Sequence, residues 1–212
     1  MLHNARDAAI EASQHKSNYL AEMSHEIRTP LNSILSLVQL LSYTQLEEEQ
    51  RADLETLESC VHALRQMIND VLDLSKIEAG KLALNPQHFS LQTSLQTVVA
   101  QFRGSFQEKR LVVDVNCEEA IPERVVGDAI RVEQVLINLV SNAIKFTPEG
   151  GRIDIHLTLV QQNSTGAEIR FDIRDSGPGI PPEKQAKIFC AFDQGDDGTF
   201  SNHGGTGLGL YI

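Results

Sequence analysis

The 212-residue sequence has few aromatic side chains, few cysteines and no long apolar run, and each shortage excludes a class of protein. Tryptophan is absent, which fits helical packing by Leu, Ile and Val. The three cysteines, Cys60, Cys117 and Cys190, lack disulfide or zinc spacing, so free thiols in a reducing compartment are expected. No apolar run reaches the ~20 residues of a membrane span, and the N-terminus is too polar for a signal peptide.

Positive charge is also scarce. The formal net charge is −11 and the isoelectric point is about 5.0. This balance argues against nucleic acid and against an anionic membrane surface as partners. The length allows one or two domains, each with its own core.

The N-terminal part, residues 1–80, is predicted to form an antiparallel helical hairpin. Residues 1–43 contain no glycine, and apolar or small residues follow a heptad spacing there. Residues 44–47 match a capping box that opens a second helix, and Gly80 is placed to end it. The two predicted seams are Leu20, Ser24, Ile27, Leu31, Ile34, Val38 and Leu41, and Leu54, Leu57, Val61, Leu64, Ile68, Val71 and Ser75.

Both predicted helices carry further apolar residues beside the seam, such as Leu37, Leu40 and Met67. A single hairpin cannot cover them, whereas two copies could do so in a four-helix bundle. We therefore expect a homodimer, the alternative being that this surface packs on the rest of the same chain.

Residues 81–90 are interpreted as a linker with a short strand, and residues 91–212 as an alternating α/β domain. Ser90 can cap a helix that extends to about residue 107. A second helix is expected over 129–146. Strands are expected over 111–117, 153–159 and 169–173, with the last two in a hairpin. These elements predict a sheet with helices on one face.

One helical stretch combines a nucleophile, a carboxylate and a hydroxyl. His25 and Glu26 are adjacent, and Thr29 lies four residues after His25 on the same helix face. Pro30 removes a backbone donor, so the Glu26 carbonyl loses its helical partner and a kink is expected. An exposed histidine beside a chance proline is the simpler interpretation of His-Glu alone.

The α/β part contains polar and glycine-rich stretches that suit a nucleotide. Asn138 and Asn142 share a helix face, followed by Lys145; amide oxygens can bind Mg²⁺ and the ammonium can meet phosphate. Asp175 follows a strand and can accept a hydrogen bond from an exocyclic amine. The run 204–210 is glycine-rich, and residues 193–203 resemble a polar lid. Each stretch also has a simpler interpretation. Asn138 and Asn142 could lie on the polar outer face of a helix, Asp175 could belong to an ordinary turn, and residues 193–203 could be a mobile loop.

The full strings resemble a known family. S-H-E-I-R-T-P-L-N at 24–32 resembles the phosphoacceptor box of sensor histidine kinases, and D-L-S-K-I-E-A-G-K-L at 73–82 resembles the end of that domain in hybrid kinases. N-L-V-S-N-A-I-K-F-T-P at 138–148, D-S-G-P-G-I at 175–180, I-F-C-A-F at 188–192 and G-G-T-G-L-G-L at 204–210 resemble the N, G1, F and G2 boxes of the ATP-binding domain.

The resemblance implies a role for each matching residue. His25 would accept the γ-phosphoryl group of ATP, Glu26 would act as base, and Thr29 would position water for dephosphorylating a partner. Asn142 with Asn138 would hold Mg²⁺. The remaining nucleotide contacts would come from Lys145 (phosphate), Asp175 (the adenine amine), and Gly177, Gly179, Gly205, Thr206, Gly207 and Gly209 (the shape of the site).

The resemblance also implies partners. They are a second copy of the chain and the receiver domain of a response regulator, in a cytoplasmic setting without direct membrane contact by this stretch. The sequence stops at Ile212, inside the helix that the glycines open, where the family continues with strands, so a truncated kinase core is expected. The alternatives are a catalytically impaired dimeric scaffold and another ATPase of the same nucleotide fold, such as a topoisomerase.

Overall fold

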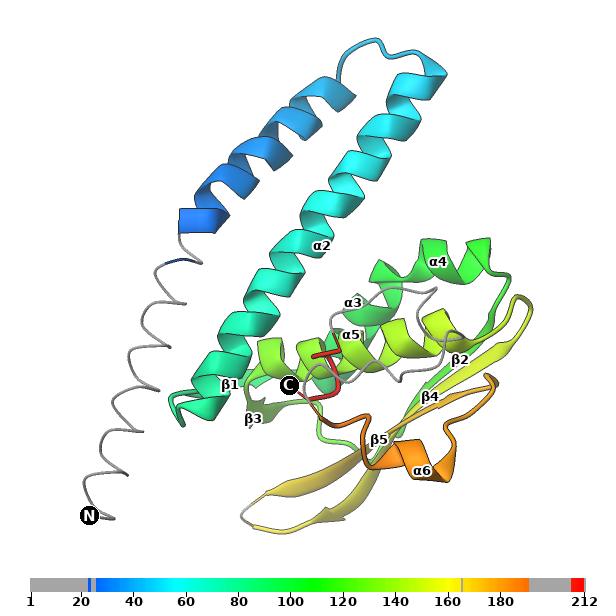
Figure 1. The fold of residues 1–212 in the computed structure, drawn as a ribbon. Helices are drawn as coiled ribbons and strands as arrows, with labels where there is room; N and C mark the ends of the chain where they lie inside the picture. The colour runs from blue at the N-terminus through cyan, green and yellow to red at the C-terminus, as the bar shows by residue number, and fades with distance from the viewer. Residues whose placement is uncertain (1–22, 24–25, 165, 191–206, 212) are drawn as a thin grey trace. The chain divides into compact units, whose positions relative to one another are not determined.

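The computed structural model describes residues 23, 26–164, 166–190 and 207–211 (Figure 1). The chain divides into two compact units, with the boundary between Leu82 and Ala83. The first is a helical hairpin, and the second is an α/β domain with a mixed three-stranded sheet. The structure confirms the predicted fold class, which is a helical hairpin followed by an α/β domain.

The hairpin pairs a helix over residues 26–42 with α2, Glu48–Glu78. Of the predicted seam, Leu31, Val38 and Val61 are buried. An apolar groove of about 190 Å³ runs between the two helices and is lined by Met23, Ile27, Leu64, Met67, Ile68, Val71 and Leu72. In the part of the chain that the structure describes, no helix is long and apolar enough to cross a membrane.

The start of α2 corrects one prediction. A capping box is present, but its first residue is Glu47, whose N–H donates to Oε1 of Gln50 at 3.1 Å. Thr44 does not open the helix. Its hydroxyl donates to the Leu41 carbonyl at 2.7 Å and closes the preceding helix instead, which is the usual competition between a threonine side chain and the backbone.

The end of α2 is as predicted. Gly80 has φ +63°, and its N–H donates to the Ile77 carbonyl, while the N–H of Lys81 donates to the Lys76 carbonyl at 2.8 Å. These two bonds define a Schellman motif, in which glycine is favoured because the left-handed conformation costs it little.

The second unit begins with a short strand, as predicted for the linker stretch over residues 81–90. β1, Gln87–Phe89, pairs antiparallel with β3, Val125–Gly127. β3 lies between the predicted strand over 111–117 and the predicted helix over 129–146, where no strand was predicted. Each of these strands has three residues, which are too few to show an alternating apolar pattern in the sequence.

Two helices follow where one was predicted. Ser90 caps α3, Leu91–Gln101, by accepting the N–H of Thr93 at 3.3 Å. The helix then breaks at Phe102, and α4, Arg103–Glu108, begins. Phe106 of α4 is buried, and its ring centroid lies 6.4 Å from that of Phe102.

The sheet has the order β2-β4-β5. β2, Val112–Cys117, pairs parallel with β4, Arg152–Gln162, and β4 pairs antiparallel with β5, Ala167–Asp175. α5, Ala129–Phe146, connects the parallel strands and lies on the same face of the sheet as α3 (Figure 1). These strands and α5 match the predicted ranges closely.

The core of the second unit lies between these helices and β4. Inward residues of the central strand alternate, and Ile153, Ile155 and Leu157 are fully buried. Above them α5 contributes Leu136 and Val140, which are 1% and 0% exposed. The rest of the buried cluster is Leu91, Leu95, Val98, Phe106, Ala143 and Ile144. This packing fixes how α5 is rotated about its axis.

Candidate functional site

α5 has one face in the core and another that carries the polar residues of the candidate site. Leu136, Val140 and Ala143 are buried on one side, whereas Asn138 and Asn142 are partly exposed and one helical turn apart. The helix begins at Asp128, whose side chain accepts the N–H of Arg131 at 3.2 Å. Burial of the apolar face therefore presents both asparagines to the same side.

Asn138 meets the glycine-rich run near the end of the chain. Its Nδ2 donates to the carbonyl of Gly209 at 2.9 Å, across 71 residues of sequence. A Cβ at Gly209 would lie only 3.4 Å from the Asn138 side chain. The structure thus brings two of the predicted nucleotide stretches together.

The loop after β5 lies against the last turn of α5. The N–H of Gly177 donates to Oδ1 of Asp175 at 2.8 Å. A Cβ at Gly177 would lie 2.6 Å from that oxygen and 2.9 Å from the carbonyl of Phe146. Only glycine fits here, because the loop backbone touches the helix end.

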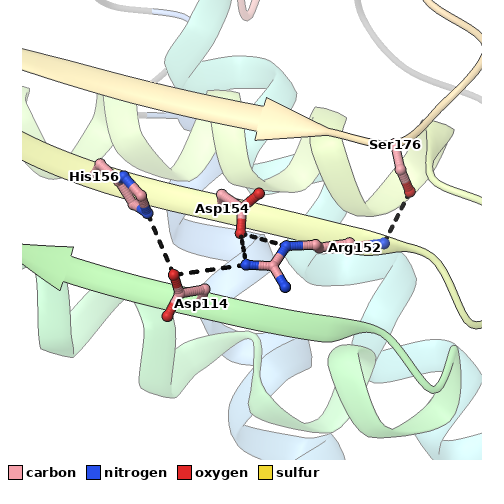
Figure 2. Close-up of polar contacts among 5 residues, drawn as sticks. All are labelled: Asp114, Arg152, Asp154, His156 and Ser176. Atoms are coloured by element: carbon pink, nitrogen blue, oxygen red, sulfur yellow. Dashed lines mark hydrogen bonds and ion pairs between the residues drawn. The ribbon is translucent and has the colours of Figure 1, made fainter.

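Ser176 fastens the same loop to β4 (Figure 2). Its Oγ accepts the backbone N–H of Arg152 at 2.8 Å, and its own N–H donates to the Arg152 carbonyl at 3.0 Å. A Cβ at Gly151 would lie 2.8 Å from the Ser176 Oγ. Ser176 therefore holds the Asp175 loop to the sheet, and Gly151 leaves room for the Ser176 hydroxyl.

Lys145 lies in the last turn of α5. Its Nζ is 5.0 Å from the centroid of the Phe146 ring, within cation–π range. Burial lowers the pKa of the Lys145 ammonium from its ordinary value, because an apolar environment disfavours the charged form. A nearby phosphate would favour that charge again.

The opposite face of the sheet carries a charged cluster of Asp114, Arg152, Asp154 and His156 (Figure 2). The Arg152 guanidinium bonds Oδ1 of Asp154 at 2.7 Å, and the pKa of that carboxyl is lowered by this contact. His156 Nε2 is 3.4 Å from Oδ2 of Asp114. Two carboxylates and a histidine could hold a metal ion, but Arg152 already supplies their positive partner.

The described residues of the predicted phosphoacceptor stretch, 26–32, lie in the hairpin. Glu26 and Thr29 are exposed on the helix over residues 26–42, which continues through Pro30. The Thr29 carbonyl accepts the hydroxyl of Ser33 at 3.1 Å. His25 itself lies outside the described residues.

Some of the other predicted site residues are described by the structure, and the rest fall outside the described residues. Gly179 and Gly207 have φ +74° and +70°, conformations that favour glycine. Phe189, in the stretch 188–192 that resembles a nucleotide box, is 60% exposed. Gly205, Thr206, the second half of the 188–192 stretch and the expected lid at 193–203 fall outside the described residues.

One residue near the end of α5, Lys109, was not predicted from the sequence. Lys109 Nζ donates to the carbonyls of Ile144, Lys145 and Thr147 at 2.7, 3.1 and 3.2 Å. It therefore contacts the end of α5 from a distant part of the chain. No spacing rule could have found it, since it lies in no motif.

Comparison with known proteins agrees with this division of the chain. The family described as His Kinase A (phospho-acceptor) domain matches residues 15–80. The family described as Histidine kinase-, DNA gyrase B-, and HSP90-like ATPase matches residues 127–212. The presence of the first domain excludes the alternative of a topoisomerase-type ATPase.

Similar full-length proteins are kinases. The signal transduction histidine-protein kinase BarA of Escherichia coli (strain K12) is 45% identical over 98% of this chain and 22% of that protein. Hybrid signal transduction histidine kinase K of Dictyostelium discoideum is 37% identical over 98% and 18%, respectively. The chain thus spans about a fifth of the length of these relatives.

A solved structure gives the same result. Full-length ShkA in complex with AMPPNP has a TM-score of 0.69 and 32% identity, over 92% of this chain and 39% of that one. The chain belongs to the sensor histidine kinases, and it is homologous to hybrid members of that family. Its two domains are those of a protein-histidine kinase.

The close fit at Gly177 predicts a large effect of a single methyl group. Gly177→Ala should lower the free energy of unfolding by about 1–3 kcal/mol, because the loop must move away from Asp175 and Phe146. Gly104→Ala is the control: its Cβ would meet nothing within 4 Å in α4, so a gain of roughly 0.4–1 kcal/mol is expected. Chemical denaturation measures both; equal stability of Gly177→Ala and the parent would contradict the tight packing.

Proposed function

We propose that this chain is an ATP-dependent protein-histidine kinase core that phosphorylates His25 and passes the phosphoryl group to an aspartate of a response-regulator receiver domain. The observation that carries the proposal is the assembly in one unit of Asn138, Gly209 and the Asp175–Gly177 loop around α5. The phosphoacceptor domain precedes it in the same chain. Because ATP is the donor, the setting is cytoplasmic.

In this proposal the nucleotide is held by groups of different chemistry. Asp175 accepts a hydrogen bond from the adenine amine, and Gly177 and Gly179 let the base approach the backbone. Lys145 contacts phosphate, and Gly205, Thr206, Gly207 and Gly209 shape the phosphate side. The ShkA structure, with its AMPPNP, supports a nucleotide in this fold.

Asn142 and Asn138 fit the metal that such a reaction uses. Both offer amide oxygens one turn apart, and the Asn138 amide nitrogen is already committed to Gly209. Mg²⁺ takes oxygen ligands and usually completes its shell with water and substrate phosphates, so two neutral side chains suffice. When bound, Mg²⁺ neutralises charge on the transferring phosphoryl group.

The acceptor chemistry follows from imidazole. Neutral histidine is nucleophilic near pH 7, and its second nitrogen passes a proton to the adjacent Glu26 as bonding to phosphorus develops. The ADP leaving group takes the electron pair of the broken P–O bond. Thr29 offers a hydroxyl that orients water when the kinase removes phosphate from its receiver partner.

The hairpin is proposed to dimerise with a second copy as a four-helix bundle. Its exposed apolar residues support this arrangement: Ile27, Ile34, Leu37, Leu40, Leu41, Leu57, Leu64 and Met67 are each 41–63% exposed. So many apolar side chains on two neighbouring helices mark an interaction surface.

Sedimentation should accordingly give twice the 23.4 kDa chain mass. Leu37→Glu with Leu40→Glu should shift the equilibrium to monomer, because each buries a charge in the bundle. Leu84→Glu is a matched control, since Leu84 is 64% exposed and lies in the other unit. A parent that is monomeric at tens of micromolar would rule out the bundle.

ATP binding should depend on the acceptor character of Asp175. Asp175→Asn should weaken ATP binding by roughly 5- to 150-fold, because a lost acceptor in the site costs ~1–3 kcal/mol. Asp172→Asn, the same charge change on the same strand, should leave the affinity unchanged. Titration calorimetry with Mg-ATP measures both. Equal affinity of Asp175→Asn and the parent would make Asp175 a turn residue only.

Labelling with γ-³²P ATP separates chemistry from binding. His25→Gln should abolish acid-labile label, whereas His62→Gln, at an exposed histidine of α2, should label normally. Glu26→Gln should slow labelling by roughly 10²–10⁴-fold, the usual cost of a lost general base. Thr29→Ala should label normally but dephosphorylate a receiver slowly. Label on His25→Gln would disprove the acceptor, and ATP binding without label on the parent would favour the scaffold alternative.

A further inference from the structure

Side chains supply most of the hydrogen bonds that close the C-terminal end of α5. The last four carbonyls of any helix lack intrahelical partners. Here the carbonyl of Ala143 accepts both the N–H of Thr147, at 3.0 Å, and its hydroxyl, at 2.6 Å. The carbonyls of Ile144 and Lys145, and that of Thr147 just beyond the helix, accept the ammonium of Lys109.

Lys109 suits the C-terminal end of α5 both in its number of hydrogen-bond donors and in its positive charge. An ammonium has three N–H donors, and Lys109 has three carbonyl acceptors between 2.7 and 3.2 Å. The carbonyl end of a helix is the negative end of its dipole, where a cation is favoured. The Lys109 carbonyl also accepts the N–H of Gly150 at 2.9 Å, so one residue holds both sides of the turn after α5.

The turn that Lys109 holds supports two parts of the candidate nucleotide site. Lys145 belongs to it, with its backbone carbonyl bonded to Lys109. The next carbonyl, that of Phe146, would lie 2.9 Å from a Cβ at Gly177, whose N–H bonds Asp175. The phosphate side and the base side of the site therefore share one turn of helix.

We propose that Lys109 is a positioning residue of the nucleotide site. It holds the last turn of α5 so that Lys145 and the Asp175–Gly177 loop keep the spacing that one nucleotide requires. It acts through backbone carbonyls and touches no substrate. The inference rests on the proposed function, and it adds a residue from outside the four nucleotide stretches.

Two substitutions next to each other in the full 212-residue chain provide the test. Lys109→Met removes the three donors, and Mg-ATP titration should show a Kd raised roughly tenfold. Arg110→Met removes the same charge one residue later. Because Arg110 is 80% exposed and pairs with Glu149 instead, its Kd should stay within about twofold of the parent's.

A merely structural role would give a different result. Lost folding lowers the number of binding sites per chain and leaves the Kd of the remaining sites unchanged, whereas misplacement raises the Kd at full stoichiometry. Lys109→Arg restores the charge but not three convergent donors, so its Kd should fall between those of Lys109→Met and the parent. A parent-like Kd in Lys109→Met, or a loss confined to stoichiometry, would overturn the inference.

A nucleotide-free measurement keeps the inference apart from the proposed function. In ¹H–¹⁵N spectra, Lys109→Met should shift the amides of Gly177 and Ser176, and Arg110→Met should not. If the parent binds no ATP, the proposed function fails, and this spectrum decides the inference. Unmoved Gly177 and Ser176 amides would overturn it.

Discussion

The packing of α5 against β4 is the contact on which the rest of the second unit depends. Leu136 and Val140 of the helix meet a strand whose inward residues, such as Ile155, are fully buried. Side chains so completely enclosed leave the helix no freedom to rotate, because any turn about its axis would expose apolar surface at about 25 cal/mol per Å². The same rotation sets the direction of Asn138 and Asn142. A hydrophobic interface thereby fixes the geometry of a polar site.

Much of this arrangement follows from sequence because it rests on local rules. The period of α5, the alternation of β4 and β5, the Ser90 cap and the Gly80 stop each depend on residues within one or two turns of one another. The polar residues of the site lie on or next to these same elements. A correct prediction of the elements therefore also predicts roughly where these residues lie. The contact of Asn138 with Gly209 could be expected only through the family resemblance, since 71 residues separate them.

The errors arise where two local rules compete or where a contact is long-range. Thr44 and Glu47 match the capping-box pattern, but the Thr44 hydroxyl bonds the Leu41 carbonyl and closes the preceding helix, and Glu47 caps α2 instead. β3 was not predicted, and its partner in the sheet, β1, lies 38 residues earlier in the chain. Lys109 and Ser176 act by side chain-to-backbone bonds to distant segments. Such bonds leave no period in the sequence, so only the folded chain reveals them.

The connection between the units is constrained from both sides. On the hairpin side, the Schellman motif at Gly80 fixes the chain through the N–H of Lys81. On the other side, the N–H of Asn85 donates to Oδ2 of Asp128 at 3.0 Å, and this bond contributes most to lowering the pKa of Asp128.

In-line phosphoryl transfer requires reacting atoms about 3–3.5 Å apart, so in the proposed reaction the ATP-binding unit must reach His25. Residues 81–84, between these two fixed points, form no regular structure. In the proposed reaction, a reorientation of one unit against the other would be taken up in this segment. Asp128 both holds Asn85 at the end of the segment and caps α5, so the segment would join the second unit directly at that helix.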